Sequence, residues 1–180
     1  MRTQIDYEKS IKRHRLTFKM TTELFMTRLL DNSLWLIFLI TAGLLFSNKN
    51  NYSNNNGVRF LVVFILITLW LLIGLLLLNK LVVVKGTNPL ENRKLIIQIM
   101  NNKFPKLKLD DAGQKIIRYD LKTGLLTWGK RITVIFQNEN IYLNITTTGR
   151  YDIKSPFHSV FHYFTLKSIG KQFKDRNKSR

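Results

Sequence analysis

Two histidines have the spacing best suited to chemistry in this sequence. His158 and His162 are four residues apart, the spacing of two zinc ligands on one face of a helix. The zinc-protease pattern also needs a glutamate directly after the first histidine, and Ser159 stands there instead. The third histidine, His14, comes much earlier in the chain. We therefore predict no metal site and interpret the pair as packing or interface residues.

Other catalytic patterns are missing from the sequence. It contains no cysteine, which excludes disulfides, thiolate metal ligands and cysteine nucleophiles. It contains neither a phosphate-binding glycine loop nor a nucleophile elbow. Asp110 and Asp111 are adjacent, so we do not expect them to face each other across a substrate, and Arg150 with His158 lacks a supporting acid. We predict a protein that is not an enzyme and that holds no cofactor.

A further group of residues suits binding. Ser155 and the proline after it predict the start of a helix over about 157–174. At about 100° per residue, aromatic rings share one side of this helix and lysines continue it, a combination that suits lipid headgroups. The alternative is that the rings form the core and the lysines are solvated. The candidate membrane- or partner-contacting residues are Phe157, Phe161, Phe164, Lys167, Lys171, Arg150 and Lys154.

Two apolar segments precede these residues. Residues 60–78 contain no charged side chain and have the length that crosses a bilayer, about 20 residues. Residues 34–46 are also apolar, and the Asn-rich loop 47–57 separates the two segments. We therefore predict a membrane α-helical hairpin of two spans over 32–84. The shorter first segment also fits a re-entrant or interfacial segment.

Basic residues flank this predicted hairpin. The positive-inside rule keeps lysines and arginines that lie close to a span in the cytoplasm. The loop contributes only Lys49, followed by Arg59. We therefore predict a multi-pass protein of the inner (plasma) membrane with both termini in the cytoplasm. Lys12, Arg13, Arg15, Lys19 and Arg28 precede the first apolar segment, and the basic residues that follow the second are Lys80, Lys85, Arg93 and Lys94.

The charge of the whole chain also points to a class of partner. There are 29 Lys and Arg residues against 11 Asp and Glu residues, a formal net charge of +18. Anionic lipid attracts basic residues near its surface by about 1 kcal/mol each. Nucleic acid attracts the same charges, but the predicted membrane tether favours lipid. A charge that only keeps the domain soluble is the remaining alternative.

The other residues predict one small domain. Residues 1–31 form an amphipathic, basic segment, and residues 86–180 form a cytosolic α+β domain. The cap residue Asn88 and the proline after it predict a helix over 89–103. Within 106–154, apolar and polar residues alternate, which predicts an antiparallel sheet with one solvent-exposed face. We expect helices to flank this sheet.

The order of these parts resembles that of a known family. The residues that carry the resemblance are a strand, Ile141-Tyr142-Leu143, and a helix junction, Ile153-Lys154-Ser155-Pro156-Phe157. In these and in its layout the chain is similar to bacterial two-span proteins with a cytosolic pleckstrin-homology-like domain, the YcxB-like kind. The resemblance implies a binding or scaffolding domain without catalytic residues. A smaller α+β sheet than that family's domain is left open.

These observations lead to one functional prediction and one alternative. The prediction is a non-catalytic integral membrane protein whose basic cytosolic domain docks on anionic lipid headgroups or on a membrane protein partner. The alternative is an effector that permeabilises the membrane when ligand binding to its cytosolic domain makes the hairpins oligomerise. Self-association is compatible with both.

Overall fold

The computed structural model describes residues 4–19, 40, 43, 55–121, 128–149 and 154–178. The chain divides into two compact units. One combines Met1–Lys19 with Gly74–Arg180, and the other is Met20–Ile73. The first unit therefore contains the sheet together with a segment from the start of the chain.

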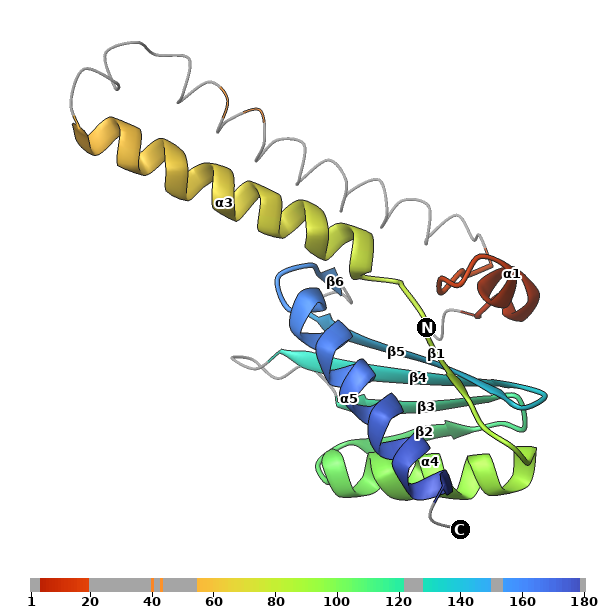
Figure 1. Ribbon diagram of the computed structural model, residues 1–180. Coiled ribbons are helices and arrows are strands. Elements are labelled where there is room, and N and C mark those ends of the chain that lie inside the picture. The colour runs from red at the N-terminus through yellow and green to blue at the C-terminus, as the bar shows by residue number, and fades with distance from the viewer. Residues whose placement is uncertain are drawn as a thin grey trace. The chain divides into compact units, whose positions relative to one another are not determined.

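An antiparallel sheet is the centre of the first unit (Figure 1). Its strands lie in the order β1-β5-β4-β3-β2, and β6 also pairs with β5. The two-residue turn at Asn138 joins β4 to β5, and Asn138 has a φ of 51°, a value that asparagine tolerates better than most residues. The bounds are β1 (Val82–Lys85), β2 (Lys108–Ala112), β3 (Ile116–Leu121), β4 (Gly129–Gln137), β5 (Asn140–Thr148) and β6 (Lys154–Ser155).

Two helices cover one face of the sheet, α4 (Pro89–Lys103) and α5 (Ser159–Lys178). The Asn88 side chain accepts a hydrogen bond from the backbone N–H of Leu90 at 3.0 Å, and proline stands in the first turn of α4. The predicted helix over 89–103 is therefore confirmed. Fully buried side chains from both helices and from the strands form the core: Ile96, Ile99, Met100, Ile117, Ile132, Val134, Leu143, Ile169 and Phe173.

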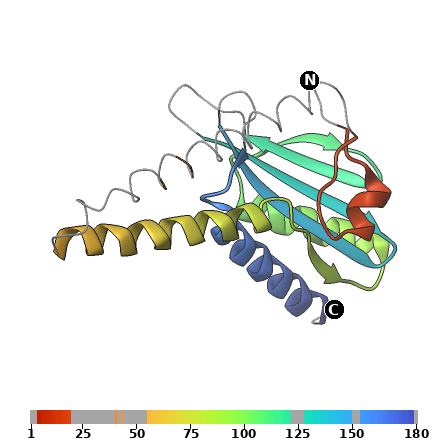
Figure 2. The same ribbon diagram turned by 90° about the horizontal axis from the view of Figure 1, so that it is seen from above.

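The segment around α1 (Tyr7–Lys12) covers the opposite face of the sheet (Figure 2). Ile5 and Leu16 are buried against Ile135 and Tyr142. The Tyr7 hydroxyl donates a hydrogen bond to the Phe136 carbonyl at 2.7 Å. The prediction of a solvent-exposed sheet face is therefore wrong, because a segment distant in sequence packs on it.

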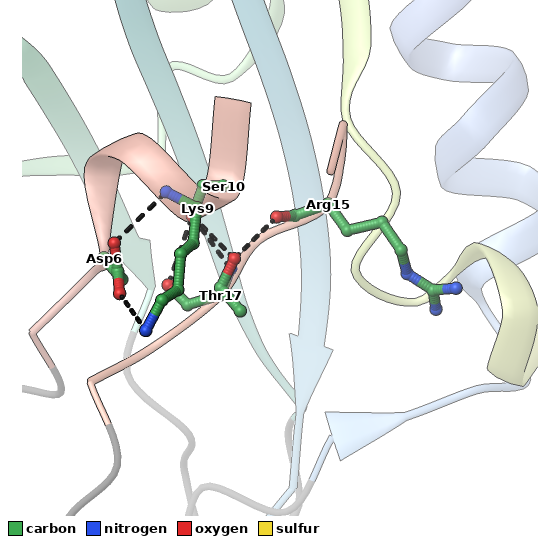
Figure 3. A network of polar contacts seen from close by, with 5 residues as sticks. All are labelled: Asp6, Lys9, Ser10, Arg15 and Thr17. Atoms are coloured by element: carbon green, nitrogen blue, oxygen red, sulfur yellow. Dashed lines mark hydrogen bonds and ion pairs between the residues drawn. The ribbon is translucent and has the colours of Figure 1, made fainter. Parts of the chain in front are cut away.

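Polar contacts hold this N-terminal segment in its shape (Figure 3). Asp6 caps α1 by accepting a hydrogen bond from the backbone N–H of Lys9 at 3.2 Å. The Ser10 hydroxyl accepts from the backbone N–H of Thr17 at 2.9 Å, and Thr17 donates to the Arg15 carbonyl at 3.2 Å. These contacts fold residues 5–18 back on themselves, so that both ends contribute to the packing.

Helix α3 (Asn55–Leu77) belongs mainly to the other unit. Within the ranges described above, no helix is long and apolar enough to cross a membrane. This finding corrects the predicted two-span hairpin over 32–84 and, with it, the multi-pass inner-membrane location with cytoplasmic termini.

The structure describes only part of the residues that two other predictions for this region concern. Of the first apolar segment, 34–46, the structure describes only Ile40 and Gly43. The predicted loop 47–57 is described from Asn55 onward, where it is already helical.

Candidate functional site

Exposed aromatic rings are the most unusual feature on the surface of α5 and the turn before it. The exposed fractions are 45% for Phe157, 61% for Phe161 and 64% for Phe164. Lys167 and Lys171 continue this side of the helix and are also exposed. We call these five residues the aromatic–lysine face.

The opposite side of α5 explains why these rings face outward. Leu166, Ile169 and Phe173 are buried in the core, and Val160 is buried too. Gly170 brings the helix close to the sheet, since a Cβ there would lie 3.0 Å from the Val84 side chain. Burial of one side therefore fixes which residues the helix exposes.

Tyr163 and Lys80 lie beside this face, next to its Lys167. The Nζ atoms of Lys80 and Lys167 each lie 5.1 Å from the centre of the Tyr163 ring. The Phe164 ring contacts the Tyr163 ring edge-on, with 6.1 Å between their centres. Lys80 was considered in the sequence only as a charge flanking a span. The spacing of Tyr163 and Lys167 at i and i+4 indicates one of these contacts, whereas nothing in the sequence indicates that Lys80 joins them.

The two basic residues predicted before α5 are not equivalent. The Lys154 ammonium donates a hydrogen bond to Asn79 Oδ1 at 2.8 Å and lies 4.3 Å from the centre of the Phe18 ring. It therefore links β6 to the N-terminal segment. Arg150 lies outside the residues that the structure describes.

The two histidines occupy different environments. His162 is buried, and its Nε2 lies 2.6 Å from the Thr147 hydroxyl on β5. Burial, with smaller effects from the charges of Lys130 and His158, lowers the pKa of His162 from 6.5 to about 4. His158 is exposed, and its ring centre lies 6.2 Å from that of His162. Among the described residues, no group of three or more potential metal-binding side chains comes together.

One ion pair lies on the sheet rather than near α5. Arg131 Nη2 is 3.0 Å from Asp120 Oδ2, and these residues are paired across β3 and β4. Both side chains are about three-quarters covered. The two residues form a structural ion pair between neighbouring strands, in which the positive charge of the arginine balances the negative charge of the aspartate.

Many cations of this chain lie over aromatic rings. The distances from the cation to the ring centre range from 4.3 Å to 5.6 Å, within the range of a favourable cation–π contact. The pairs outside the α5 region are Arg93 with Phe136, Lys115 with Tyr7, and Lys130 with Phe104. Ring faces thus interact with positive charges in a chain that is poor in carboxylates.

A second apolar surface lies on α3. Its exposed side chains include Leu66 at 61% and Leu76 at 64%, with Val62, Val63, Leu69 and Ile73 near 50%. Any binding experiment on the full chain must therefore separate the contribution of this helix from that of α5.

No family model, curated protein or solved structure matches this chain. The resemblance to YcxB-like proteins therefore stays a prediction.

Proposed function

We propose that this protein is a non-catalytic binding module whose aromatic–lysine face docks on a surface of anionic lipid. The observation that carries the proposal is the exposure of Phe161 and Phe164 on a helix whose other side already supplies the core. A helix needs one apolar side to pack on its own sheet. A second apolar side on the same helix is suited to contact with a partner or a membrane surface.

The composition of the face favours a lipid surface. Phenylalanine rings gain free energy when they leave water for the boundary between headgroups and acyl chains, while lysines extend their ammonium groups to the phosphates. Lys167 and Lys171 follow the rings along the same side of α5. The net charge of +18 adds attraction to any negatively charged membrane.

A vesicle-binding experiment on the full chain tests this proposal. We expect stronger binding to vesicles of phosphatidylcholine with phosphatidylserine than to vesicles of phosphatidylcholine alone, and weaker binding as salt rises. Changing both Phe161 and Phe164 to Ser should weaken binding by about thirtyfold at unchanged net charge, because partial burial of each ring contributes roughly 1 kcal/mol.

A matched variant controls for general loss of apolar surface. Leu90→Ser removes a side chain on α4 that is 72% exposed and outside the face, so binding should stay as in the wild type. The contribution of α3 is the same in every variant and cancels in the comparison. Equal binding of the phenylalanine variant and the wild type, with both folded, would show that the face does not dock on lipid.

The alternative effector function is not proposed. It required two membrane-spanning hairpin helices that oligomerise, and the described part of the chain contains no helix able to cross a membrane.

A further inference from the structure

Lys80 and Lys167 approach the same aromatic ring from different parts of the fold. Because each Nζ lies 5.1 Å from the centre of the Tyr163 ring, the two nitrogens are at most twice that distance apart. Neither lysine forms an ion pair with a carboxylate of the described residues. Two exposed ammonium groups therefore share one ring, and no carboxylate of the described residues is paired with either of them.

The backbone of Lys80 is held in place. Asn144, which is buried on β5, donates hydrogen bonds through its amide nitrogen to the Lys80 carbonyl at 2.9 Å and to the Leu78 carbonyl at 3.4 Å. Lys80 also pairs with Arg15 of the N-terminal segment in an isolated bridge. The side chain of Lys80 thus starts from a fixed point beside the sheet.

The backbone of Lys167 is fixed as well. It follows the buried Leu166 on α5, and the helix is anchored to the core by Ile169 and Phe173. The exposed Phe164 lies beside Tyr163 on the same helix. A ligand held by the two lysines would therefore lie next to the aromatic–lysine face.

We infer that Lys80, Tyr163 and Lys167 form a site for the phosphate group of an anionic lipid headgroup. The inference rests on the proposed function and makes it more specific. A phosphate bound beside Tyr163 complements the positive charge of the two lysines, and an ammonium group can donate a hydrogen bond to a phosphate oxygen. The ring limits the directions in which both lysines can move.

The specific prediction is a preference among lipids of equal charge. A phosphomonoester headgroup exposes more phosphate oxygens than a phosphodiester does. The full chain should therefore bind phosphatidylcholine vesicles with phosphatidic acid several-fold more tightly than vesicles with phosphatidylserine matched for surface charge. Changing both Lys80 and Lys167 to Gln should remove this preference. Inorganic phosphate should compete with phosphatidic acid better than chloride does at equal ionic strength.

Charge-matched variants separate the site from the overall charge. Lys106 and Lys108 are exposed residues outside the site, and changing both to Gln should weaken binding to the two lipids equally. Changing Lys80 and Lys167 to Arg keeps both charges and should keep the preference. If the double glutamine variant unfolds, Lys167→Gln alone tests the site, because it changes only one exposed position on the helix.

The outcomes distinguish this inference from the proposed function. Equal effects of the Lys80/Lys167 and Lys106/Lys108 glutamine variants on the preference would overturn the site and leave lipid docking intact. Competition by inorganic phosphate without any vesicle preference would show a site for free phosphate and overturn the lipid assignment. A wild type that binds neutral and anionic vesicles alike would overturn the proposed function itself.

Discussion

The fold lowers the proton affinity of His162. Burial beside Thr147 favours the neutral ring and lowers its pKa to about 4, while the unfolded chain keeps a value near 6.5. Because the unfolded state then binds more protons, this residue contributes full stability above about pH 6.5 and loses it as pH falls towards 4.

Replacing His162 by Gln should remove part of the acid sensitivity. Between about pH 7 and about pH 5, the free energy of unfolding of the wild type should fall by roughly 2 kcal/mol more than that of His162→Gln. Urea denaturation at both pH values measures the difference. His158→Gln removes only the smallest of the causes that lower the pKa of His162, so it should keep most of the wild-type loss. Equal pH dependence in all three proteins would contradict the assignment.

Gly86 shows how little space the buried Asn92 leaves. The Asn92 side chain accepts a hydrogen bond from the backbone N–H of Thr87 and donates one to the Glu139 carbonyl, both at 3.2 Å. A Cβ on Gly86 would overlap this amide group. Gly86→Ala should therefore reduce the free energy of unfolding by about 2 kcal/mol.

A double-mutant cycle checks the cause of that loss. In an Asn92→Ala background the amide is absent, so adding Gly86→Ala should cost far less than it does in the wild type. Urea denaturation of the four proteins gives the coupling energy. Additive effects would show that a glycine is needed at position 86 for its backbone conformation and not for the space that it leaves beside Asn92.

At the scale of elements, the N-terminal segment is part of the folded unit. Leu16 is 4% exposed and packs with Ile5, Leu81 and Tyr142 on the sheet. Leu16→Ala should lower the free energy of unfolding by about 3 kcal/mol, because it leaves a cavity in this second core. Leu90→Ala, at a position 72% exposed, should change it by less than about 0.5 kcal/mol. A negligible effect of Leu16→Ala would mean that the segment is detached in solution.

The elements differ in how far the sequence predicts them. The signals for α4 are local, since Asn88 and the following proline act within one turn, and its bounds were predicted correctly. The segment that covers the other face of the sheet depends on contacts such as that between Tyr7 and Phe136 of β4, which are 129 positions apart. No local pattern indicates such a contact, so the sequence predicts one solvent-exposed sheet face, whereas Tyr142 is buried.

The candidate site was predictable only in part, for the same reason. Both sides of α5 are apolar, so periodicity identifies two faces and leaves open which one the sheet covers. Burial of Leu166 and Phe173 decides this in the structure. The convergence of Lys80 on Tyr163 requires the sheet and the side chain of Asn144, and the sequence contains no sign of it.

For the whole molecule, the net charge of +18 predicts that added salt changes the stability of the fold and the strength of vesicle binding in opposite directions. Like charges repel more strongly in the compact state, and the Debye length falls from about 30 Å at 0.01 M salt to about 8 Å at 0.15 M. Moderate sodium chloride should therefore raise the urea midpoint of unfolding while it weakens vesicle binding. A midpoint that falls with salt would show that attractive charge pairs outweigh the repulsion.

The hydrogen bond between Tyr7 and Phe136 also has a consequence for synthesis on the ribosome. The acceptor emerges 129 residues after the donor. At about 5 to 20 residues per second, the N-terminal segment waits roughly 6 to 26 s for the strands that bury Ile5 and Leu16. During that time its apolar side chains are open to nascent-chain binding factors, and this sheet face closes only when β5 has been made.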